Sequence, residues 1–338
     1  MTNLHHRFAL WLQTRWYGAK PPVFLLPLSA LFGVVTAGRR WLYARHLLKP
    51  VRLPVRVVVI GNLAVGGSGK TPLVAWLAHE LNQRNVPVGI VTRGYGRRDQ
   101  GVRRVEKRTP ATAVGDEPRW LAAVTNVPVV IGADRVAAVR ALLAETPVDI
   151  VLSDDGLQHY RLAREVEIVM LDARRGLGNA ALLPAGPLRE PPSRLSCADA
   201  VIIKGSGDVV LPDLPVVLHM HYSLGNAERL LDGSTRPLAE FRDRPVRALA
   251  AIGDPESFFQ ALEANGLTVE RVALSDHAPV ADTVAQLPPD RPLLMTAKDA
   301  VKLNAPPKHA WQVPLAVTFS TDDTATLLSL VLGNHKME

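Results

Sequence analysis

Short apolar runs alternate with longer amphipathic stretches through the first 205 residues. The runs are rich in Val and Ile, as buried parallel strands are. They predict strands at 57–61, 88–92, 127–131, 148–152, 166–171 and 199–203, with helices at 70–84, 116–125 and 134–145. Alternating strands and helices indicate an α/β fold with a parallel sheet, in which ligands bind at the carboxyl ends of the strands.

The pattern changes after residue 205 and resumes near residue 246. Residues 206–245 lack helical periodicity and are rich in Asp, Pro and Gly, which predicts a strand-containing linker. A second, smaller α/β unit follows, with strands at 246–252, 268–274 and 292–296 and helices at 255–265, 280–286 and 322–332. We therefore expect four parts: an N-terminal membrane-associated segment, 1–50; a first α/β domain, 51–205; the linker, 206–245; and a second α/β domain, 246–338.

The N-terminal part contains an uncharged segment, 21–38, with basic residues and aromatic rings on both sides. Interfacial anchors of membrane proteins have this composition. The segment is short for a membrane-spanning helix and contains Pro21, Pro22 and Pro27. Basic charge on both flanks favours a helix that lies in, or dips into, one leaflet. A signal peptide and a buried apolar helix are the alternatives.

Charge and cysteine content narrow the class of protein. The first 78 residues contain ten Lys and Arg and no Asp or Glu, whereas the whole chain of 338 residues has a net charge of +7. This basic segment predicts an anionic partner, and the apolar helix favours an anionic membrane over nucleic acid. Cys197 is the only cysteine, so no intrachain disulfide forms, which fits a reducing compartment. We expect Cys197 to be a small core residue. The sequence specifies no oligomeric state.

A glycine-rich turn follows the first predicted strand and ends in Gly-Lys-Thr, directly before a helix. This is the context of a phosphate-binding P-loop, whose backbone N–H groups surround phosphate oxygens. Lys70 would reach the β- and γ-phosphates of ATP, and the Thr71 hydroxyl would bind Mg²⁺. The expected loop consists of Ala64, Val65, Gly66, Gly67, Ser68, Gly69, Lys70 and Thr71. Ala64 replaces the usual first glycine, and a chance Gly-Lys-Thr in a turn is the alternative.

Acidic residues lie at the ends of three of the other predicted elements. Asp154 and Asp155 come just after the strand at 148–152, where P-loop proteins place a carboxylate beside Mg²⁺; a turn or helix cap is the alternative. Asp172 is a weaker candidate of the same kind. Asp116 precedes a predicted helix and could cap it or serve in catalysis.

Basic residues at element ends form a second group of candidates. Arg135 has a side chain suited to bidentate phosphate recognition, although a surface ion pair is the alternative. His277 and Lys298 each follow a strand of the second unit. A structural role is the alternative for His277. Lys298 belongs to the stretch Thr296-Ala297-Lys298-Asp299, which is a candidate for contact with a nucleotide base or phosphate.

Taken together, these motifs resemble the tetraacyldisaccharide 4′-kinase family, the lipid A 4′-kinases of Gram-negative bacteria. The resemblance extends from the apolar segment to about Leu303. The matching stretches are GNLAVGGSGKTP, TRGYGRR, GDEPRWLA, ADR, LSDDGLQH, LLPAGPLREP, IGDPESFF, SDH and LLMTAKDAVKL. It implies a P-loop α/β/α domain, a second α/β/α domain and a monotopic or peripheral enzyme at the cytoplasmic face of the inner membrane. The activity implied is ATP-dependent phosphorylation of the 4′-hydroxyl of tetraacyldisaccharide 1-phosphate, a lipid, to give lipid IVA.

The resemblance also implies roles for individual residues. Lys70 and Thr71 would serve ATP and Mg²⁺, and Asp154 would help to hold the metal. Asp116 would act on the attacking hydroxyl with His277 as its partner. Further residues match active-site positions with less defined roles: Arg135 and Asp155 in catalysis, and Tyr95, Gln158, Arg189 and Glu190 in substrate binding. The chain departs from the family at Ser275 and at Ala297, where an acid is common.

The competing function is a membrane-surface P-loop ATPase switch without lipid kinase activity. Such switches often carry an additional lysine in the loop, at the position that Val65 occupies here. A soluble small-molecule kinase would not account for the apolar, basic N-terminal segment. The sequence therefore favours the lipid kinase.

Overall fold

The structure is a computed structural model that describes residues 11–18, 20–66, 69–94, 101–106, 109–207, 209, 211, 214, 216–275, 278–303 and 305–333. The chain divides into two compact units, each assembled from separate segments. Unit 1 comprises Met1–Lys70, Val148–His221 and Phe319–Glu338. Unit 2 comprises Thr71–Pro147 and Tyr222–Thr318. The four-part division expected from the sequence stays a prediction.

Unit 1 is organised around five parallel strands in the order β8, β7, β6, β1, β5. Their bounds are β1 Arg56–Gly61, β5 Ile150–Asp154, β6 Val166–Asp172, β7 Ala200–Lys204 and β8 Val217–Leu224. All five residues of β5 are buried, as expected for a central parallel strand. β5 lies two residues later than its predicted range, so Asp154 is part of the strand.

The last helix of the chain belongs to unit 1. α10, Thr321–Leu332, matches its predicted range and begins with Ser320 as its N-cap. At its other end the Arg56 guanidinium donates to the carbonyl oxygens of Val331 at 2.7 Å and Leu330 at 3.0 Å. These carbonyls lack intrahelical partners, so a strand residue completes the hydrogen bonding of the helix end.

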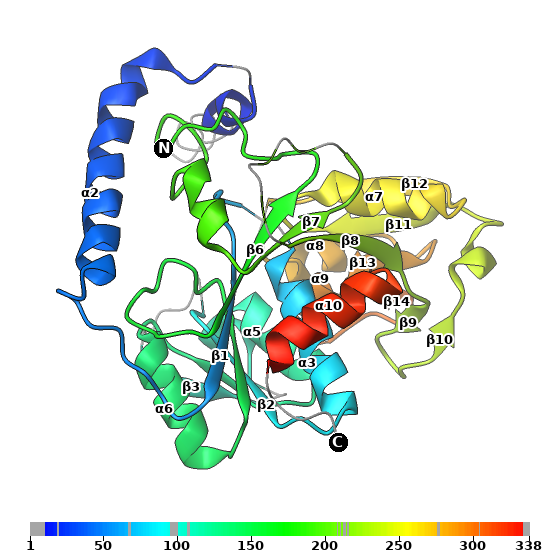
Figure 1. The fold of residues 1–338 in the computed structure, drawn as a ribbon. Coiled ribbons are helices and arrows are strands. Elements are labelled where there is room, and N and C mark those ends of the chain that lie inside the picture. The colour runs from blue at the N-terminus through cyan, green and yellow to red at the C-terminus, as the bar shows by residue number, and fades with distance from the viewer. Residues whose placement is uncertain are drawn as a thin grey trace. The chain divides into compact units, whose positions relative to one another are not determined.

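The uncharged N-terminal segment forms η1, Val23–Leu25, followed by α2, Leu26–Ala44, which Figure 1 draws as a long blue helix. Pro27 lies in the first turn of α2, where its missing N–H costs no helical hydrogen bond. By length and composition Val23–Ala44 could cross a membrane, and 6% of its most apolar window is buried. The alternative of a buried apolar helix is therefore wrong.

The side of α2 that carries Ser29 and Gly33 packs against Leu182 of the same unit. The Ser29 hydroxyl donates to the Leu182 carbonyl at 2.7 Å, and a Cβ at Gly33 would lie 2.9 Å from the Leu182 side chain. Most of the large apolar side chains of this region are exposed: Val23, Phe24, Leu26, Leu28, Leu31, Val34, Val35 and Trp41. The helix thus has one anchored face and one apolar face that is largely exposed.

The first segment of unit 2 contains a short run of strands in the order β2, β4, β3. The strands are β2 Val88–Thr92, β3 Arg103–Val105 and β4 Val129–Ile131. The helices are α3 Lys70–Gln83, α4 Ala111–Val114, α5 Asp116–Val124 and α6 Arg135–Glu145. The sequence predicted the longer helices within one residue, and it predicted no strand at the position of β3.

The second segment of unit 2 forms a six-stranded sheet in the order β10, β9, β14, β13, β11, β12. The strands are β9 Ala227–Arg229, β10 Thr235–Arg236, β11 Val246–Ala250, β12 Val269–Ala273, β13 Leu293–Thr296 and β14 Ala310–Val313, and β15 Leu315–Thr318 follows. The helices are η3 Leu238–Phe241, α7 Pro255–Ala264, α8 Ala281–Gln286 and α9 Ala297–Ala300. The predicted linker therefore contributes β9 and β10 to this sheet.

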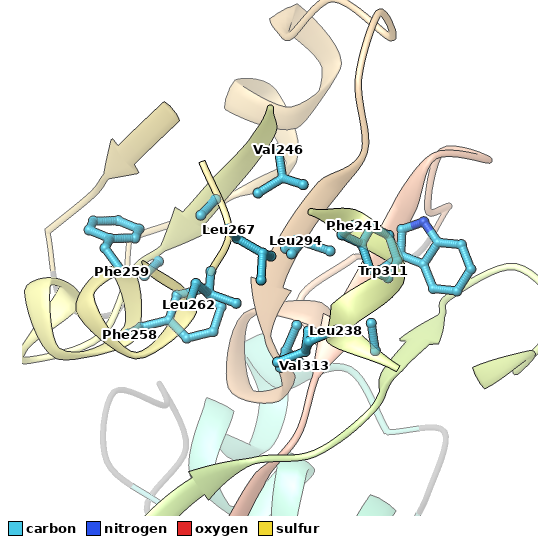
Figure 2. Close-up of a cluster of buried hydrophobic side chains, with 13 residues drawn as sticks. Leu238, Phe241, Val246, Phe258, Phe259, Leu262, Leu267, Leu294, Trp311 and Val313 are labelled. Atoms are coloured by element: carbon cyan, nitrogen blue, oxygen red, sulfur yellow. The ribbon is translucent and has the colours of Figure 1, made fainter. Parts of the chain in front are cut away.

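Aromatic and aliphatic side chains from several of these elements form the core shown in Figure 2. Phe241 of η3 packs edge-on against Trp311 of β14, with ring centroids 5.3 Å apart. Phe258, Phe259 and Leu262 face inward from α7 and are buried. This core holds β11 and β13, whose carboxyl ends lead to the charged residues described below.

Candidate active site

The candidate phosphate-binding loop follows the buried strand β1 and precedes α3, which begins at Lys70. Gly66 and Gly69 have φ values of +117° and +89°, which side chains with a Cβ rarely adopt. Lys70 therefore opens the helix directly after a turn made by glycine. Gly67 and Ser68 lie outside the described residues, so their predicted role remains a prediction.

A neighbouring segment fixes the start of this loop. Ala64 forms an antiparallel bridge with Leu188, and the Val65 N–H donates to the Pro187 carbonyl at 2.8 Å. The Arg189 N–H donates to the Leu63 carbonyl at 2.7 Å. Backbone hydrogen bonds thus bring Arg189 beside the loop, although the two are distant in sequence.

Three predicted site residues meet at this point. The Lys70 ammonium lies 3.4 Å from Asp155 Oδ1, and the Arg189 guanidinium donates to the same oxygen at 3.2 Å. Burial alone would raise the pKa of Asp155, but the charges of Lys70 and Arg189 outweigh it and hold that pKa below its ordinary value. Asp155 follows β5 with a φ of +50°, an unfavourable conformation that this set of contacts helps to maintain.

Gln158 and Glu190 extend the cluster. The Gln158 amide donates to Glu190 Oε1 at 3.1 Å and to the Asn62 carbonyl at 3.3 Å, and Gln158 Oε1 accepts from Arg189 at 3.3 Å. Glu190 is 2% exposed. The structure therefore brings together Lys70, Asp155, Gln158, Arg189 and Glu190, all of which the sequence marked as site residues.

The other two acids of unit 1 have different surroundings. Asp154 ends β5, is 1% exposed and lies opposite Ile60 of β1 in the parallel register, next to the strand that enters the loop. Asp172 ends β6, forms an ion pair with Lys204 of β7 and accepts from the Arg174 N–H at 3.0 Å. Asp154 thus lies beside the strand that enters the loop, whereas Asp172 is held by a neighbouring lysine.

Asp116 belongs to unit 2 and is the first residue of α5. The N-cap is Gly115, with a φ of +95°, and no side chain caps this helix. Instead, Asp116 Oδ2 lies 3.5 Å from the Lys302 ammonium. The capping alternative for Asp116 is therefore wrong, because its carboxylate faces a lysine.

Lys302 also binds a second, deeper acid. Its ammonium lies 2.9 Å from Oδ1 of Asp299, which is 0% exposed. The other oxygen of Asp299 accepts from the Ala251 N–H at 3.0 Å and from the Thr296 hydroxyl at 2.7 Å. Lys302 is itself 7% exposed, so a buried cation is shared between a structural acid and Asp116.

A second lysine makes a parallel contact. Lys298, on α9, donates to Glu117 at 3.0 Å, so two lysines of one segment face the two acids that begin α5. Sequence reasoning left the role of Lys298 open, named Asp299 only as part of the same stretch, and missed Lys302. The available signal was the spacing of two lysines four residues apart after a predicted strand.

Arg135 begins α6, directly after its N-cap Asp134, which accepts from Val136 N at 2.9 Å and Ala137 N at 3.3 Å. Arg135 is 3% exposed and donates to the Gly132 carbonyl at 2.6 Å. A surface ion pair, the alternative for this residue, does not fit such burial.

Three further predictions have mixed outcomes. Tyr95 and His277 lie outside the described residues, so the pairing of Asp116 with His277 stays a prediction. The described part of the chain holds no group of three or more His, Cys, Asp or Glu arranged for a metal ion. The expectation that Cys197 is a core residue is wrong: it ends η2, Pro192–Cys197, and is exposed.

Comparison with known proteins identifies the family. The family model for tetraacyldisaccharide-1-P 4′-kinase matches residues 22–333. The chain belongs to the tetraacyldisaccharide 4′-kinase family. It is 44% identical to the tetraacyldisaccharide 4′-kinase of Chromobacterium violaceum, over 96% of this chain and 98% of that one. It is 45% identical to that of an Azoarcus species, over 93% of each chain.

A solved structure in this kinase family has the same fold. LpxK from Aquifex aeolicus, crystallised in complex with ATP, superposes with a TM-score of 0.80 at 28% identity. The superposition covers 91% of this chain and 99% of the other. The predicted α/β fold and the family expected from the motifs are thus confirmed.

Proposed function

We propose that this chain transfers the γ-phosphoryl group of ATP to the 4′-hydroxyl of tetraacyldisaccharide 1-phosphate, giving lipid IVA in lipid A biosynthesis. The observation that carries the proposal is the placement of Lys70 beside Asp155 and Arg189 at the P-loop, within a family match that spans residues 22–333. A lysine and an arginine at this position supply the positive charge that phosphoryl transfer requires.

The residues present fit a magnesium ion. Mg²⁺ takes oxygen ligands, and in nucleotide sites it uses few protein ligands beside the phosphates. Asp154 is a buried carboxylate at the end of β5, and Thr71 is the hydroxyl that follows Lys70 in the motif. We propose that these two residues hold the ion. When bound, it would neutralise charge on the β- and γ-phosphates.

The Lys70 ammonium would leave Asp155 and bind the phosphates when ATP binds. The phosphates would take over the Lys70 ammonium that Asp155 now faces at 3.4 Å. Arg189 would remain bound to Asp155 and orient it, and Gln158 would support Arg189, because the Arg189 guanidinium donates to both side chains. The predicted roles of Arg135, Tyr95 and Glu190 at this site are part of the same proposal.

Asp116 would accept the proton of the attacking 4′-hydroxyl. Lys302 keeps a positive charge 3.5 Å from the Asp116 carboxylate, which favours the ionised form that a general base needs. His277 is proposed as the partner of Asp116 from the family resemblance alone.

The lipid substrate and α2 indicate where the enzyme works. An amphipathic helix with an apolar exposed face and basic flanks binds anionic membranes. We propose that α2 docks the chain peripherally or monotopically on the inner membrane. The cytoplasmic face is the side where ATP is available.

The test measures phosphoryl transfer directly. Purified protein is incubated with γ-labelled Mg-ATP and tetraacyldisaccharide 1-phosphate in mixed micelles, and mass spectrometry identifies the product. We expect one added phosphate on the lipid, and Lys70→Ala to lower turnover about 10²- to 10³-fold or more. Release of inorganic phosphate without lipid product would instead support the ATPase switch.

A further inference from the structure

The C-terminal part of α2 contacts two residues of unit 1, Tyr160 and Glu190. The rings of Tyr43 and Tyr160 lie 5.7 Å apart, and the Arg39 guanidinium lies 5.8 Å from the Tyr160 ring. Arg40 Nε lies 3.9 Å from Glu190 Oε2. The helix that carries the exposed apolar face therefore reaches both residues.

Glu190 connects this contact to the nucleotide site. The same Oε2 accepts from the Tyr160 hydroxyl and lies 3.4 Å from Arg194 Nε, while Oε1 accepts from Gln158 at 3.1 Å. From Gln158 the contacts described above continue without a gap to the Lys70 ammonium. Each contact lies within unit 1.

We propose that Arg40 and Tyr160 are positioning residues, which hold Glu190 so that Gln158 and Arg189 keep Asp155 and Lys70 in their working arrangement. The inference rests on the proposed function. It adds that α2 supports the chemistry as well as the attachment to the membrane.

The charges of this cluster suit such a role. Glu190 is 2% exposed, and an acid this buried is stable only while its partners stay in place. Burial and the Glu190 charge raise the pKa of Tyr160, so its hydroxyl remains a donor across the working pH range. Arg40, by contrast, is 28% exposed and belongs to the element that would bind lipid. A shift of α2 would thus alter the least buried support of Glu190.

The experiment compares full-length variants in mixed micelles with γ-labelled Mg-ATP and tetraacyldisaccharide 1-phosphate. Arg40→Gln removes the charge next to Glu190, and Arg40→Lys retains it. Arg45→Gln is the matched control, because Arg45 ends the same helix, is exposed and stacks on Trp41. Tyr160→Phe keeps the ring and removes the donor. Each variant is measured for kcat, for both KM values, for vesicle binding and for melting temperature.

We expect Arg40→Gln to lower kcat about fivefold, the scale of one partly exposed ion pair. Arg40→Lys should recover most of this loss, and vesicle binding should match that of Arg45→Gln. In a Glu190→Gln background Arg40→Gln should cause no further loss.

Equal kcat for Arg40→Gln and Arg45→Gln would overturn the inference. It would also be overturned if Arg40→Gln lowered kcat by the same factor in the wild type and in the Glu190→Gln background. If Glu190→Gln does not fold, a double-mutant cycle of Arg40→Gln with Tyr160→Phe decides. A fold-decrease in kcat of the double variant that is smaller than the product of the two single fold-decreases supports the inference, and a fold-decrease equal to that product refutes it. Failure of the proposed function gives a different result, namely no labelled lipid from the wild-type enzyme.

Discussion

Replacing Lys302 by Met should destabilise unit 2 strongly. Lys302 is 7% exposed and neutralises Asp299, which is 0% exposed, at 2.9 Å. Removing one partner of a buried ion pair leaves an uncompensated charge and costs about 3–5 kcal/mol. In a folding unit of this size each kcal/mol lowers the melting temperature by about 2–4 °C, so we expect a fall of about 6–20 °C.

The assay is thermal and urea unfolding of the full-length protein. Lys308→Met is the matched control, because Lys308 is exposed on the following segment and undergoes the same change of side chain. The double variant Lys302→Met/Asp299→Asn should recover much of the loss. The amide side chain introduced by Asp299→Asn would keep an oxygen for the Ala251 N–H and the Thr296 hydroxyl while removing the unpaired charge.

The same substitution of Lys302 should also lower kcat, because it removes the cation that lies 3.5 Å from the Asp116 carboxylate and holds that side chain in place. A Lys302→Met variant that melts within about 2 °C of Lys308→Met, or single losses that simply add in the double variant, would refute the reasoning.

Three other predictions concern the rest of the site and the helix. Lys70→Met should make Asp155 titrate at higher pH in carboxyl-carbon NMR spectra, because the variant lacks a cation that lowers the Asp155 pKa. The Asp155 pKa lies below its unfolded value of about 3.9, so the ion pairs of Asp155 stabilise the fold above that pH and this stabilisation is lost as pH falls. The loss of stability at acid pH should therefore be smaller in Lys70→Met than in the wild type. Unchanged titration would mean that the pair is absent in solution. Asp116→Ala should lower kcat about 10²- to 10⁴-fold and His277→Ala less, with a double variant little worse than Asp116→Ala; additive rate effects in this cycle would exclude their pairing. Val34→Glu/Val35→Glu, at side chains 69% and 62% exposed, should reduce binding to anionic vesicles without lowering the melting temperature, and unchanged sedimentation with vesicles would argue against α2 as the docking helix.

The sequence predicted the elements whose signal is local. β1, α3 and the segment between them carry a β-branched run, glycines and a helical period within a short stretch, and the structure has the strand and the helix where they were expected. β9, β10 and β14 were missed as sheet members, because each has two to four residues and gains its stability from pairing with distant strands. Periodicity cannot detect strands this short.

The sequence predicted the site residues that belong to a recognisable motif and missed those whose role depends on a contact between distant parts of the chain. Lys298 and Glu117 are 181 residues apart, so no local pattern relates them. Asp116 after Gly115 fits a helix cap as well as a catalytic acid, and only the structure, in which Gly115 is the N-cap, excludes the cap. Lys302 shows its importance only through the buried acid that it neutralises.

The two candidate catalytic residues, Lys70 and Asp116, each lie beside an opposite charge, Asp155 and Lys302 respectively. The two ion pairs differ in how readily they can separate. Lys70 faces Asp155, whose side chain is 35% exposed and is also bound by Arg189. A triphosphate offers more negative charge than one carboxylate, so it can displace Asp155 while Arg189 still satisfies that acid. Lys302 cannot leave in the same way, because Asp299 is fully buried and has no other cation among its described contacts. A sugar hydroxyl is neutral and cannot replace Asp116 as the partner of Lys302 either. Lys70 should therefore exchange its partner in every catalytic cycle, whereas Lys302 should remain in place and keep Asp116 ionised.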